Sequence, residues 1–302
     1  MTLSIVIITH NEEANLGRTL ESVKALVSDG RGEIIVVDSG STDRTVEIAR
    51  SFGAKVFVEE WKGYAAQKNS AIDKATGDWI LSLDADESLE SGTAGAIHFL
   101  VSRPGGFTEL ELQNLALVKE GDSLDTVEMV MAVEEAVDSA RSAEEIPLAL
   151  SGYSFSRKNL FLGRWIKHGG FWPDPKLRLF RRGYGRIGKR AVHETVKVDG
   201  YTAKVKTGGI LHHSYPTLSD YIEHMNRYSS LGAEMVVAKA NGKVRFSVIN
   251  IVLRPLATFV YNYFLRLGFL DGREGLLLHL YHGVYVSWKY AKAWELSRKH
   301  SS

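Results

Sequence analysis

The chain has 302 residues, of which 44% are hydrophobic and 24% charged, and its formal net charge is +1. This composition excludes disorder over the whole length, and the length suits one large α/β domain with additions or two small domains. The sequence contains no cysteine, which excludes disulfide bonds, thiolate metal sites and a cysteine nucleophile.

The first 92 residues alternate between strand-like and helix-like segments. β-branched runs at 3–8, 33–37, 55–58 and 79–83 predict strands, and the segments between them have helical spacing. This alternation predicts an α/β fold with a mostly parallel central sheet and helices on both faces. The first run has no basic leader and ends in acidic residues. We therefore expect a strand of a cytoplasmic protein rather than a signal peptide.

Polar residues stand where the predicted strands end. Asn11 follows the first strand and is expected to cap the next helix, Asp38 follows the second strand, and Asp84 and Asp86 follow the fourth. Parallel sheets bind ligands beyond the carboxyl ends of their strands. We therefore expect these side chains to share one rim of the sheet.

The triplet Asp84-Ala85-Asp86 can face one divalent cation. Hard carboxylate oxygens suit Mg²⁺ or Mn²⁺, and such an ion bridges a diphosphate and neutralises the charge of a departing nucleoside diphosphate. An ordinary surface turn is the alternative, since Asp-x-Asp triplets are common. The position after an apolar strand favours the metal site.

Asp38 stands before a loop that contains Gly40. Its carboxylate can accept hydrogen bonds from a ribose or a base edge, and the glycine lets the backbone come close to a ligand. Helix capping is the alternative role. Residues 41–43 can start and cap the second helix without Asp38, which predicts that its carboxylate is free for a ligand.

Two further residues have the chemistry of a transfer site. Glu194, beside His193, can act as a general base that takes the proton from an acceptor hydroxyl. An ordinary exposed acid is the alternative. His212 follows an apolar run and can complete a metal shell, with a structural histidine as the alternative.

Residues 183–188 have the spacing of a dinucleotide-binding fingerprint. They follow two arginines rather than a buried strand, and they lead into Lys189-Arg190 rather than into a helix. We interpret them as a basic, glycine-rich loop or hairpin. A nicotinamide-dependent oxidoreductase is therefore disfavoured.

The middle of the chain changes charge sign. Residues 93–150 are strongly acidic from 119 to 145, and valines at helical spacing between 126 and 140 predict a solvated helical insertion. Residues 151–216 are basic as far as 200, with interleaved aromatic residues. Such a stretch can bind phosphates, anionic lipid head groups or nucleic acid, but no nucleic-acid recognition module accompanies it.

Residues 217–302 are expected to form a helical, membrane-associating region. From Phe246 to Trp294 the chain is apolar and aromatic, but charged residues and a proline interrupt it, which argues against a spanning helix. Two helices lying in a membrane interface are predicted, with packing on the catalytic domain as the alternative. The aromatic residues expected at head-group level are Tyr261, Tyr263, Trp288, Tyr290 and Trp294.

Taken together, these motifs resemble the family 2 glycosyltransferases of GT-A fold, and within them a lipopolysaccharide-core β-1,4-glucosyltransferase-like subgroup. The matching segments are 8–12, 36–43, 77–87, 161–165, 178–180, 192–194, 210–212 and 268–272, together with Asp174. One departure is the long acidic stretch between the Asp-Ala-Asp-Glu segment and Phe161, which is much shorter in the subgroup. That stretch can reshape access of the acceptor.

The resemblance implies inverting transfer of a hexose, glucose from UDP-glucose in the subgroup, onto a lipid-linked acceptor of the lipopolysaccharide inner core. It implies that residues 1–92 and 151–216 are the two halves of a GT-A domain that works at the inner face of the cytoplasmic membrane. The implied donor contacts are Thr9, Asn11, Glu12, Asp38, Lys68 and Asp84. The implied metal ligands are Asp86 and His212, the implied base is Glu194, and Asp174 is the rival base.

Two other functions are compatible with the sequence. One is a GT-A transferase that acts on polyprenyl phosphate or on another glycan. The other is a non-catalytic, UDP-sugar-binding membrane protein, against which the acidic pair and the candidate base argue. A nucleic-acid partner is not expected.

Overall fold

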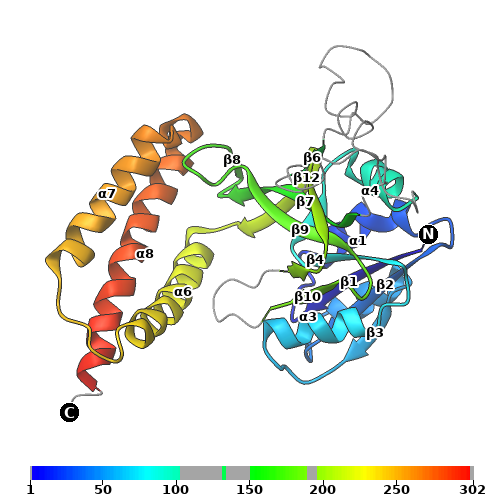
Figure 1. The fold of residues 1–302 in the computed structure, drawn as a ribbon, viewed down its shortest axis with the longest axis horizontal. Coiled ribbons are helices and arrows are strands. Elements are labelled where there is room, and N and C mark those ends of the chain that lie inside the picture. The colour runs from blue at the N-terminus through cyan, green and yellow to red at the C-terminus, as the bar shows by residue number, and fades with distance from the viewer. Residues whose placement is uncertain (1, 103–130, 134–149, 189–195, 300–302) are drawn as a thin grey trace, which may run out of the picture. The chain divides into compact units, whose positions relative to one another are not determined.

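The computed structural model describes residues 2–102, 131–133, 150–188 and 196–299 (Figure 1). The chain forms two compact units. The first comprises Met1–Arg157, Pro175–Arg190 and Glu194–His212, and the second comprises Lys158–Asp174, Ala191–His193 and His213–Ser302. The division into four segments at residues 92, 150 and 216 stays a prediction.

Four parallel strands form the N-terminal half of the sheet, in the order β3-β2-β1-β4. They are β1 (Leu3–Thr9), β2 (Gly32–Asp38), β3 (Lys55–Val58) and β4 (Trp79–Asp84). In their register Thr9 lies opposite Asp38, and Ile8 lies opposite Asp84. Because the strands run the same way, Asp38 and Asp84 lie at one rim, as the sequence predicts.

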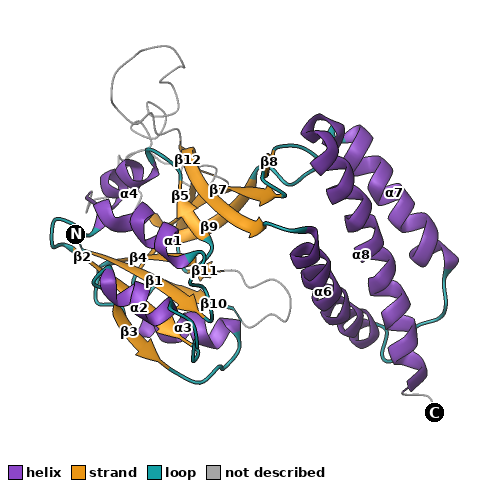
Figure 2. Ribbon diagram, turned by 180° about the vertical axis from the view of Figure 1, so that it is seen from behind, coloured by secondary structure: helices purple, strands orange, loops and turns teal. Residues whose placement is uncertain are grey.

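Helices cover both faces of these strands (Figure 2). Over one face lie α1 (Leu16–Val23), the 3-10 helix η1 (Lys24–Leu26), α2 (Thr45–Ser51) and α4 (Thr93–Ser102), and over the other lies α3 (Tyr64–Asp73). Along β1, Leu3, Ile5 and Ile7 pack into the first face and Val6 into the second. The apolar run from Ile5 to Ile8 in β1 is thus explained by burial on both sides.

Further strands continue the sheet in the order β4-β9-β7-β12-β5. They are β9 (Asp174–Arg181), β7 (Leu150–Phe161), β12 (Tyr201–Tyr215) and β5 (Glu87–Leu89), with β8 (Arg164–Ile166) beside β7 and β6 (Met131–Val133) beside β12. The β4-β9 and β12-β5 pairs are antiparallel. The second of these places His212 opposite Glu87, next to the turn that follows β4. The α/β sheet with helices on both faces is confirmed.

A separate two-stranded antiparallel sheet contains the middle of the glycine-rich segment at 183–188. It consists of β10 (Gly185–Ile187) and β11 (Val196–Val198), and Gly185 lies opposite Val198. The segment therefore forms a strand rather than opening a helix. This confirms the interpretation as a hairpin and removes the basis for a dinucleotide site there.

The predicted beginnings of the first two helices were wrong. Asn11 does not cap the first helix, which starts at Leu16. Asn11 instead has a left-handed backbone (φ 54°), and its amide oxygen accepts a hydrogen bond from the Thr42 backbone N–H at 2.9 Å. The second helix starts at Thr45, because the preceding polar residues are used to connect the two loops rather than to begin a helix.

The helical spacing between 126 and 140 was also misleading. Residues 131–133 form strand β6, which pairs antiparallel with β12. Apolar valines that recur at three- and four-residue intervals match a helix, but β-branched residues also favour strands when an open strand edge is available. The rest of the predicted insertion after Ser102 and before Leu150 lies outside the described residues.

The second unit is mainly helical. Its helices are α6 (Leu218–Lys239), the π-helical η2 (Ile249–Leu253), α7 (Arg254–Val260), the π-helical η3 (Tyr261–Leu265), the 3-10 helix η4 (Gly268–Asp271) and α8 (Gly272–Lys299). A capping box between Thr217 and Asp220 starts α6. Helix α8 packs along both α6 and α7. Within the described residues, no helix is both long and apolar enough to cross a bilayer.

Candidate active site

Acidic side chains from separate segments converge at the carboxyl rim of the parallel strands. The pKa of Glu12, in the loop after β1, is affected by the other acids of the rim. Burial raises the pKa of Glu12, and the negative charges of Asp86, Asp43 and Asp84 raise it further, while a hydrogen bond from Asn15 lowers it. Such an acid-rich rim attracts cations and repels a bare diphosphate. A bound cation would compensate this repulsion and allow an anionic donor to bind.

Asp86 and His212 form a pair at this rim. The Asp86 Oδ2 and His212 Nε2 atoms are 3.2 Å apart, and the side chains are 27% and 17% exposed. Asp86 follows β4, and His212 reaches it from β12. Burial would raise the pKa of Asp86, but the His212 hydrogen bond and charge lower it below the ordinary value. The carboxylate is therefore ionised at neutral pH and accessible from solvent.

This pair fits a divalent cation as part of its ligand set. A carboxylate oxygen and an imidazole nitrogen are ligands that Mn²⁺ accepts, and Mg²⁺ is commonly held by one or two carboxylates together with substrate phosphates. Among the described residues, no group of three or more acids, histidines or cysteines is arranged to hold a metal. A cation at Asp86 and His212 would therefore need oxygens from a bound diphosphate or from water.

Asp84 contacts cationic side chains in this structure, and the expectation that it faces one ion together with Asp86 stays a prediction. Its two oxygens are taken by cationic side chains, with Lys68 Nζ 2.6 Å from Oδ1 and Arg178 Nη2 2.7 Å from Oδ2. Burial would raise the pKa of Asp84, but Arg178 and Lys68 hold it well below its usual range. Lys68 and Asp84, both expected to contact the donor, thus bind each other in this structure, and their donor contacts stay predictions.

Glu87 and two arginines form a buried layer behind Asp84. Glu87 has no exposed surface, and its Oε1 lies 2.6 Å from Arg178 Nη2 and 3.1 Å from Arg157 Nη1. Its Oε2 accepts a hydrogen bond from the Asp84 backbone N–H at 3.1 Å. This layer fixes the turn that carries Asp84 and Asp86. Glu87 and Arg178 lie in the resembled motifs, but their residue patterns alone predict no role for them.

Asp38 is not free for a ligand, which corrects a second prediction. Its side chain is completely buried. One oxygen accepts hydrogen bonds from the Gly40 and Ser41 backbone N–H groups at 3.0 and 2.8 Å, and the other accepts from the Thr9 hydroxyl at 2.9 Å and from the Ser41 hydroxyl. The carboxylate therefore shapes the loop after β2. A donor contact at Asp38 stays a prediction that would require this loop to open.

The loops after β1 and β2 are tied to each other by polar contacts. The Asn11 backbone N–H donates to the Ser41 hydroxyl at 2.8 Å, and the Glu12 backbone N–H donates to the Thr45 hydroxyl at 2.7 Å. Thr9, one of the expected donor contacts, is buried and bonded to Asp38. Of the expected donor residues, Asn11 is exposed, and Glu12, Lys68 and Asp84 are partly exposed.

The two candidate bases are not tested by this arrangement. Glu194 lies outside the described residues. Asp174 is the first residue of β9 and belongs to the second unit, whereas Asp84, Asp86 and His212 belong to the first. The assignment of the base therefore stays a prediction.

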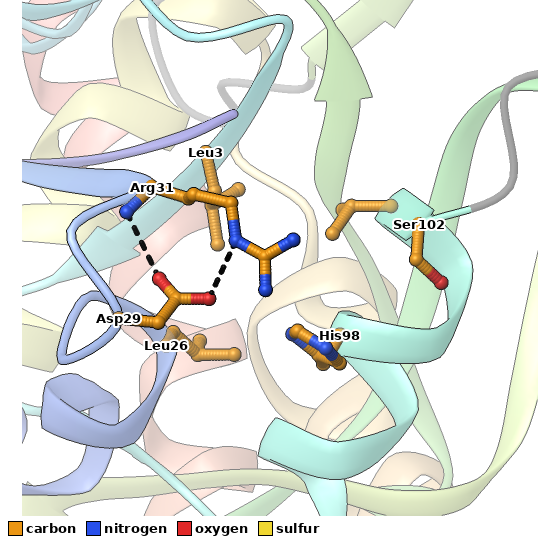
Figure 3. A pocket seen from close by; sticks show the side chains of 7 residues that line it. Leu3, Leu26, Asp29, Arg31, His98 and Ser102 are labelled. Carbon is orange, nitrogen blue, oxygen red and sulfur yellow. Dashed lines mark hydrogen bonds and ion pairs between the residues drawn. The ribbon is translucent and has the colours of Figure 1, made fainter. Parts of the chain in front are cut away.

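A small cavity lies at the opposite, amino-terminal edge of the strands (Figure 3). It has a volume of about 30 Å³ and is lined by Leu3, Leu26, Asp29, Arg31, His98, Val101 and Ser102. Asp29 accepts hydrogen bonds from the backbone and side chain of Arg31, both at 2.9 Å. This cavity is too small for a nucleotide sugar and lies away from the rim acids.

Similarity to known proteins indicates the family of the N-terminal domain. Residues 4–96 match the profile of Glycosyl transferase family 2, a segment that contains the parallel strands and the rim acids. Residues 4–96 therefore form a Glycosyl transferase family 2 domain, which confirms the resemblance for this part of the chain, and the expected α/β fold with helices on both faces of the sheet is confirmed.

The chain is also similar to individual proteins, over different shares of its length. The chain is 28% identical to the lipopolysaccharide core biosynthesis glycosyltransferase LpsC of Rhizobium meliloti, over 98% of this chain and 93% of LpsC. It is 45% identical to the uncharacterized glycosyltransferase RT0209 of Rickettsia typhi, over 32% of each chain. A solved structure, residues 1–349 of TarS from S. aureus, is 14% identical with a TM-score of 0.40, and the alignment covers 100% of this chain and 92% of TarS.

Proposed function

We propose that the chain is an inverting glycosyltransferase that moves a hexose from a UDP-hexose donor to a lipid-linked acceptor of the lipopolysaccharide inner core. The observation that carries this proposal is the Asp86–His212 pair at the carboxyl rim of the family 2 domain. The full-length similarity to LpsC supports the acceptor class, and glucose is the donor sugar in the subgroup that the motifs resemble. The enzyme would work at the inner face of the cytoplasmic membrane.

Asp86 and His212 are the residues that would hold Mg²⁺ or Mn²⁺. When bound, the cation neutralises charge on the diphosphate leaving group. Lys68 and Arg178 contribute fixed positive charge next to Asp84, close to where that leaving group would lie. The buried Glu87–Arg178 contact keeps the Asp84–Asp86 turn in place before the donor arrives.

The proposed reaction is a single in-line displacement. Glu194 takes the proton from an acceptor hydroxyl, whose oxygen attacks the anomeric carbon from the face opposite the diphosphate. The new carbon–oxygen bond forms as the bond to the diphosphate oxygen breaks, and UDP leaves with the bonding electron pair. Asp174 is the rival base.

Replacement of the candidate base gives the first prediction. General-base help is worth about 10²–10⁴ in rate, so we expect Glu194→Gln to reduce kcat by roughly that factor. The binding of UDP, measured by isothermal titration, should stay largely unchanged. Asp174→Asn serves as the comparison variant. Full transferase activity in Glu194→Gln together with its loss in Asp174→Asn would move the role to Asp174.

Two alternatives are separated by the same assays. A transferase that acts on polyprenyl phosphate or another glycan would turn over with those acceptors and not with core oligosaccharide lipids. A non-catalytic UDP-sugar-binding protein would bind UDP-hexose and neither hydrolyse nor transfer it with any divalent ion. The retained Asp86–His212 pair favours the catalytic function.

A further inference from the structure

An exposed apolar face runs along the consecutive helices η2, α7 and η3 of the second unit. Residues at helical spacing along these helices are about half exposed or more, which is unusual for large hydrophobic side chains in such a periodic arrangement. They are Ile249 (65%), Leu253 (54%), Leu256 (57%), Val260 (48%), Phe264 (51%) and, next to them, Leu265 (71%). We name these six residues the apolar face.

The opposite side of the same helices is occupied by the protein itself. Pro255 is buried, and its carbonyl approaches Gly283 of α8 so closely that an added Cβ there would lie 3.2 Å away. The Ile251 carbonyl accepts a hydrogen bond from the Ser287 hydroxyl of α8 at 2.8 Å. The apolar face is therefore not the inner surface of an incompletely packed helix. It is the outward side of a helix whose inner side already has its partner.

The charges around the apolar face have one sign. From residue 242 to residue 270 the sequence contains four basic residues and no acidic residue. The basic residues are Lys243, Arg245, Arg254 and Arg266, and all four are exposed. Arg254 lies over the ring of Tyr290 at 5.2 Å, and Arg266 lies over the ring of Tyr261 at 5.9 Å. A partner of this face therefore has to offer apolar material together with negative charge.

From these observations we infer that the apolar face inserts into the head-group region of an anionic lipid bilayer, with the four basic residues contacting lipid phosphates. Large apolar side chains on one side of a helix and basic residues beside them are the features of helices that lie in a membrane interface. Each basic residue near an anionic leaflet adds about 1 kcal/mol, equivalent to about fivefold in affinity. A second copy of the chain docked through this face would oppose the same four cations, which disfavours self-association.

This inference refines the membrane attachment that the sequence predicts. Two interfacial helices were expected, but α8 packs between α6 and α7, and its Trp294 ring contacts Phe246 at 5.1 Å. In the part of the second unit that the structure describes, the η2–α7–η3 run presents such an apolar face. The inference rests on the proposed function for its biological setting, because a lipid-linked acceptor has to be reached at a bilayer surface.

Vesicle flotation with the full chain tests the inference. Wild-type protein should float with vesicles of phosphatidylcholine mixed with phosphatidylglycerol, and clearly less with phosphatidylcholine alone. Val260→Glu should weaken binding by about tenfold or more, because it replaces an inserting side chain by a charge. Val58→Glu is the matched control, since Val58 is 61% exposed on β3 of the first unit, and it should bind as the wild type does.

A second variant tests the charge requirement. Lys243→Gln combined with Arg245→Gln should weaken binding to the phosphatidylglycerol vesicles by about fivefold per charge and leave binding to phosphatidylcholine nearly unchanged. Thermal unfolding and UDP titration of every variant establish that the fold and the donor site are intact. Equal flotation of Val260→Glu and wild type would overturn the inference. So would a dimer that Val260→Glu converts to a monomer in the absence of any vesicle binding.

The same experiment separates this inference from the proposed function. Wild-type protein that floats with anionic vesicles but transfers sugar to no lipid-linked acceptor would contradict the proposed function and support the docking face. Wild-type protein that transfers sugar to a lipid-linked acceptor without binding vesicles would contradict the docking face and support the proposed function.

Discussion

Glu87 carries a buried negative charge that two arginines compensate. It is completely buried, and the Arg178 side chain, 8% exposed, contacts both Glu87 and Asp84. Removing charges from water costs several kcal/mol per ion, and this cost is offset only while every charge keeps its partners. The buried layer therefore fixes the geometry of the turn and adds little net stability. Replacement of one of its residues should nevertheless lower the free energy of unfolding, because it leaves a buried charge without a partner.

Replacement of Arg178 tests this reasoning. Arg178→Met leaves Glu87 and Asp84 each with one cation fewer, and we expect the free energy of unfolding to fall by about 3–5 kcal/mol. Arg178→Lys should lose less stability, although a single ammonium cannot reproduce the guanidinium contacts to both acids. Denaturant titration measures both values.

The control for this experiment is an arginine at the surface. Arg186 contacts Asp73 where the two side chains are 58% and 56% exposed, and exposed ion pairs contribute little. Arg186→Met should therefore leave the unfolding midpoint nearly unchanged. Similar losses in Arg178→Met and Arg186→Met would contradict the importance of the buried layer.

The kinds of residue at the site were predictable, and their pairing was not. Asp84, Asp86 and His212 stood out because carboxylates and an imidazole follow apolar runs. The sheet register places His212 opposite Glu87, and side-chain packing pairs Asp84 with Lys68 and Arg178, and neither is visible in the residue pattern. Asp38 was misjudged because a hydrogen-bonded loop leaves the same sequence pattern as a ligand contact.

At the scale of elements, the parallel strands were predictable because each is a short β-branched run buried on two faces. Strand β3 has the limits that its residues predict, and β1 differs by one residue at its end. The starts of α1 and α2 were missed because contacts between distant loops, such as Asn11 with Thr42, compete with helix capping. Strand β6 was missed because its pairing partner, β12, is remote in the sequence.

Helix α8 contains a titratable group, His282, that makes the folding stability of the protein depend on pH. Burial lowers the pKa of His282 to about 4, and the nearby charges of His279 and Lys289 lower it further. The folded state therefore takes up this proton only near pH 4, whereas the unfolded chain takes it up near the ordinary value of 6.5. Stability is fully present above about pH 6.5 and is lost as the pH falls toward 4, by about 3 kcal/mol in all.

The variant His282→Phe tests this dependence. It keeps the ring that packs 5.8 Å from Phe171 and removes the proton site. Denaturant titrations at pH 7 and pH 4.5 should show a smaller loss of unfolding free energy in this variant than in the wild type. His98→Phe, at an exposed position of α4, should keep the wild-type loss. An unchanged pH dependence in His282→Phe would contradict the buried, neutral state of His282.

At the scale of the whole molecule, the chain contains two candidate functional regions, which differ in how visible they are in the sequence. The first is a rim where acids meet at the ends of parallel strands, which spacing and composition reveal. The second is the apolar face, which the sequence showed only as an interrupted apolar tail. Its limits depend on which sides of η2, α7 and η3 pack against α8, and this packing is not encoded in hydropathy alone.

A cation held by Asp86 and His212 against the donor diphosphate is the central feature of the proposed function. Isothermal titration of UDP with and without Mn²⁺ tests it, on wild-type protein, on Asp86→Asn and on Asp29→Asn, an acid at the opposite edge of the sheet. We predict that Mn²⁺ increases the UDP affinity of the wild type and of Asp29→Asn. In the presence of Mn²⁺, Asp86→Asn should bind UDP with an affinity lower than that of the wild type by roughly tenfold or more. An equal Mn²⁺-dependent gain in Asp86→Asn, or no effect of Mn²⁺ on the wild type, would contradict the account.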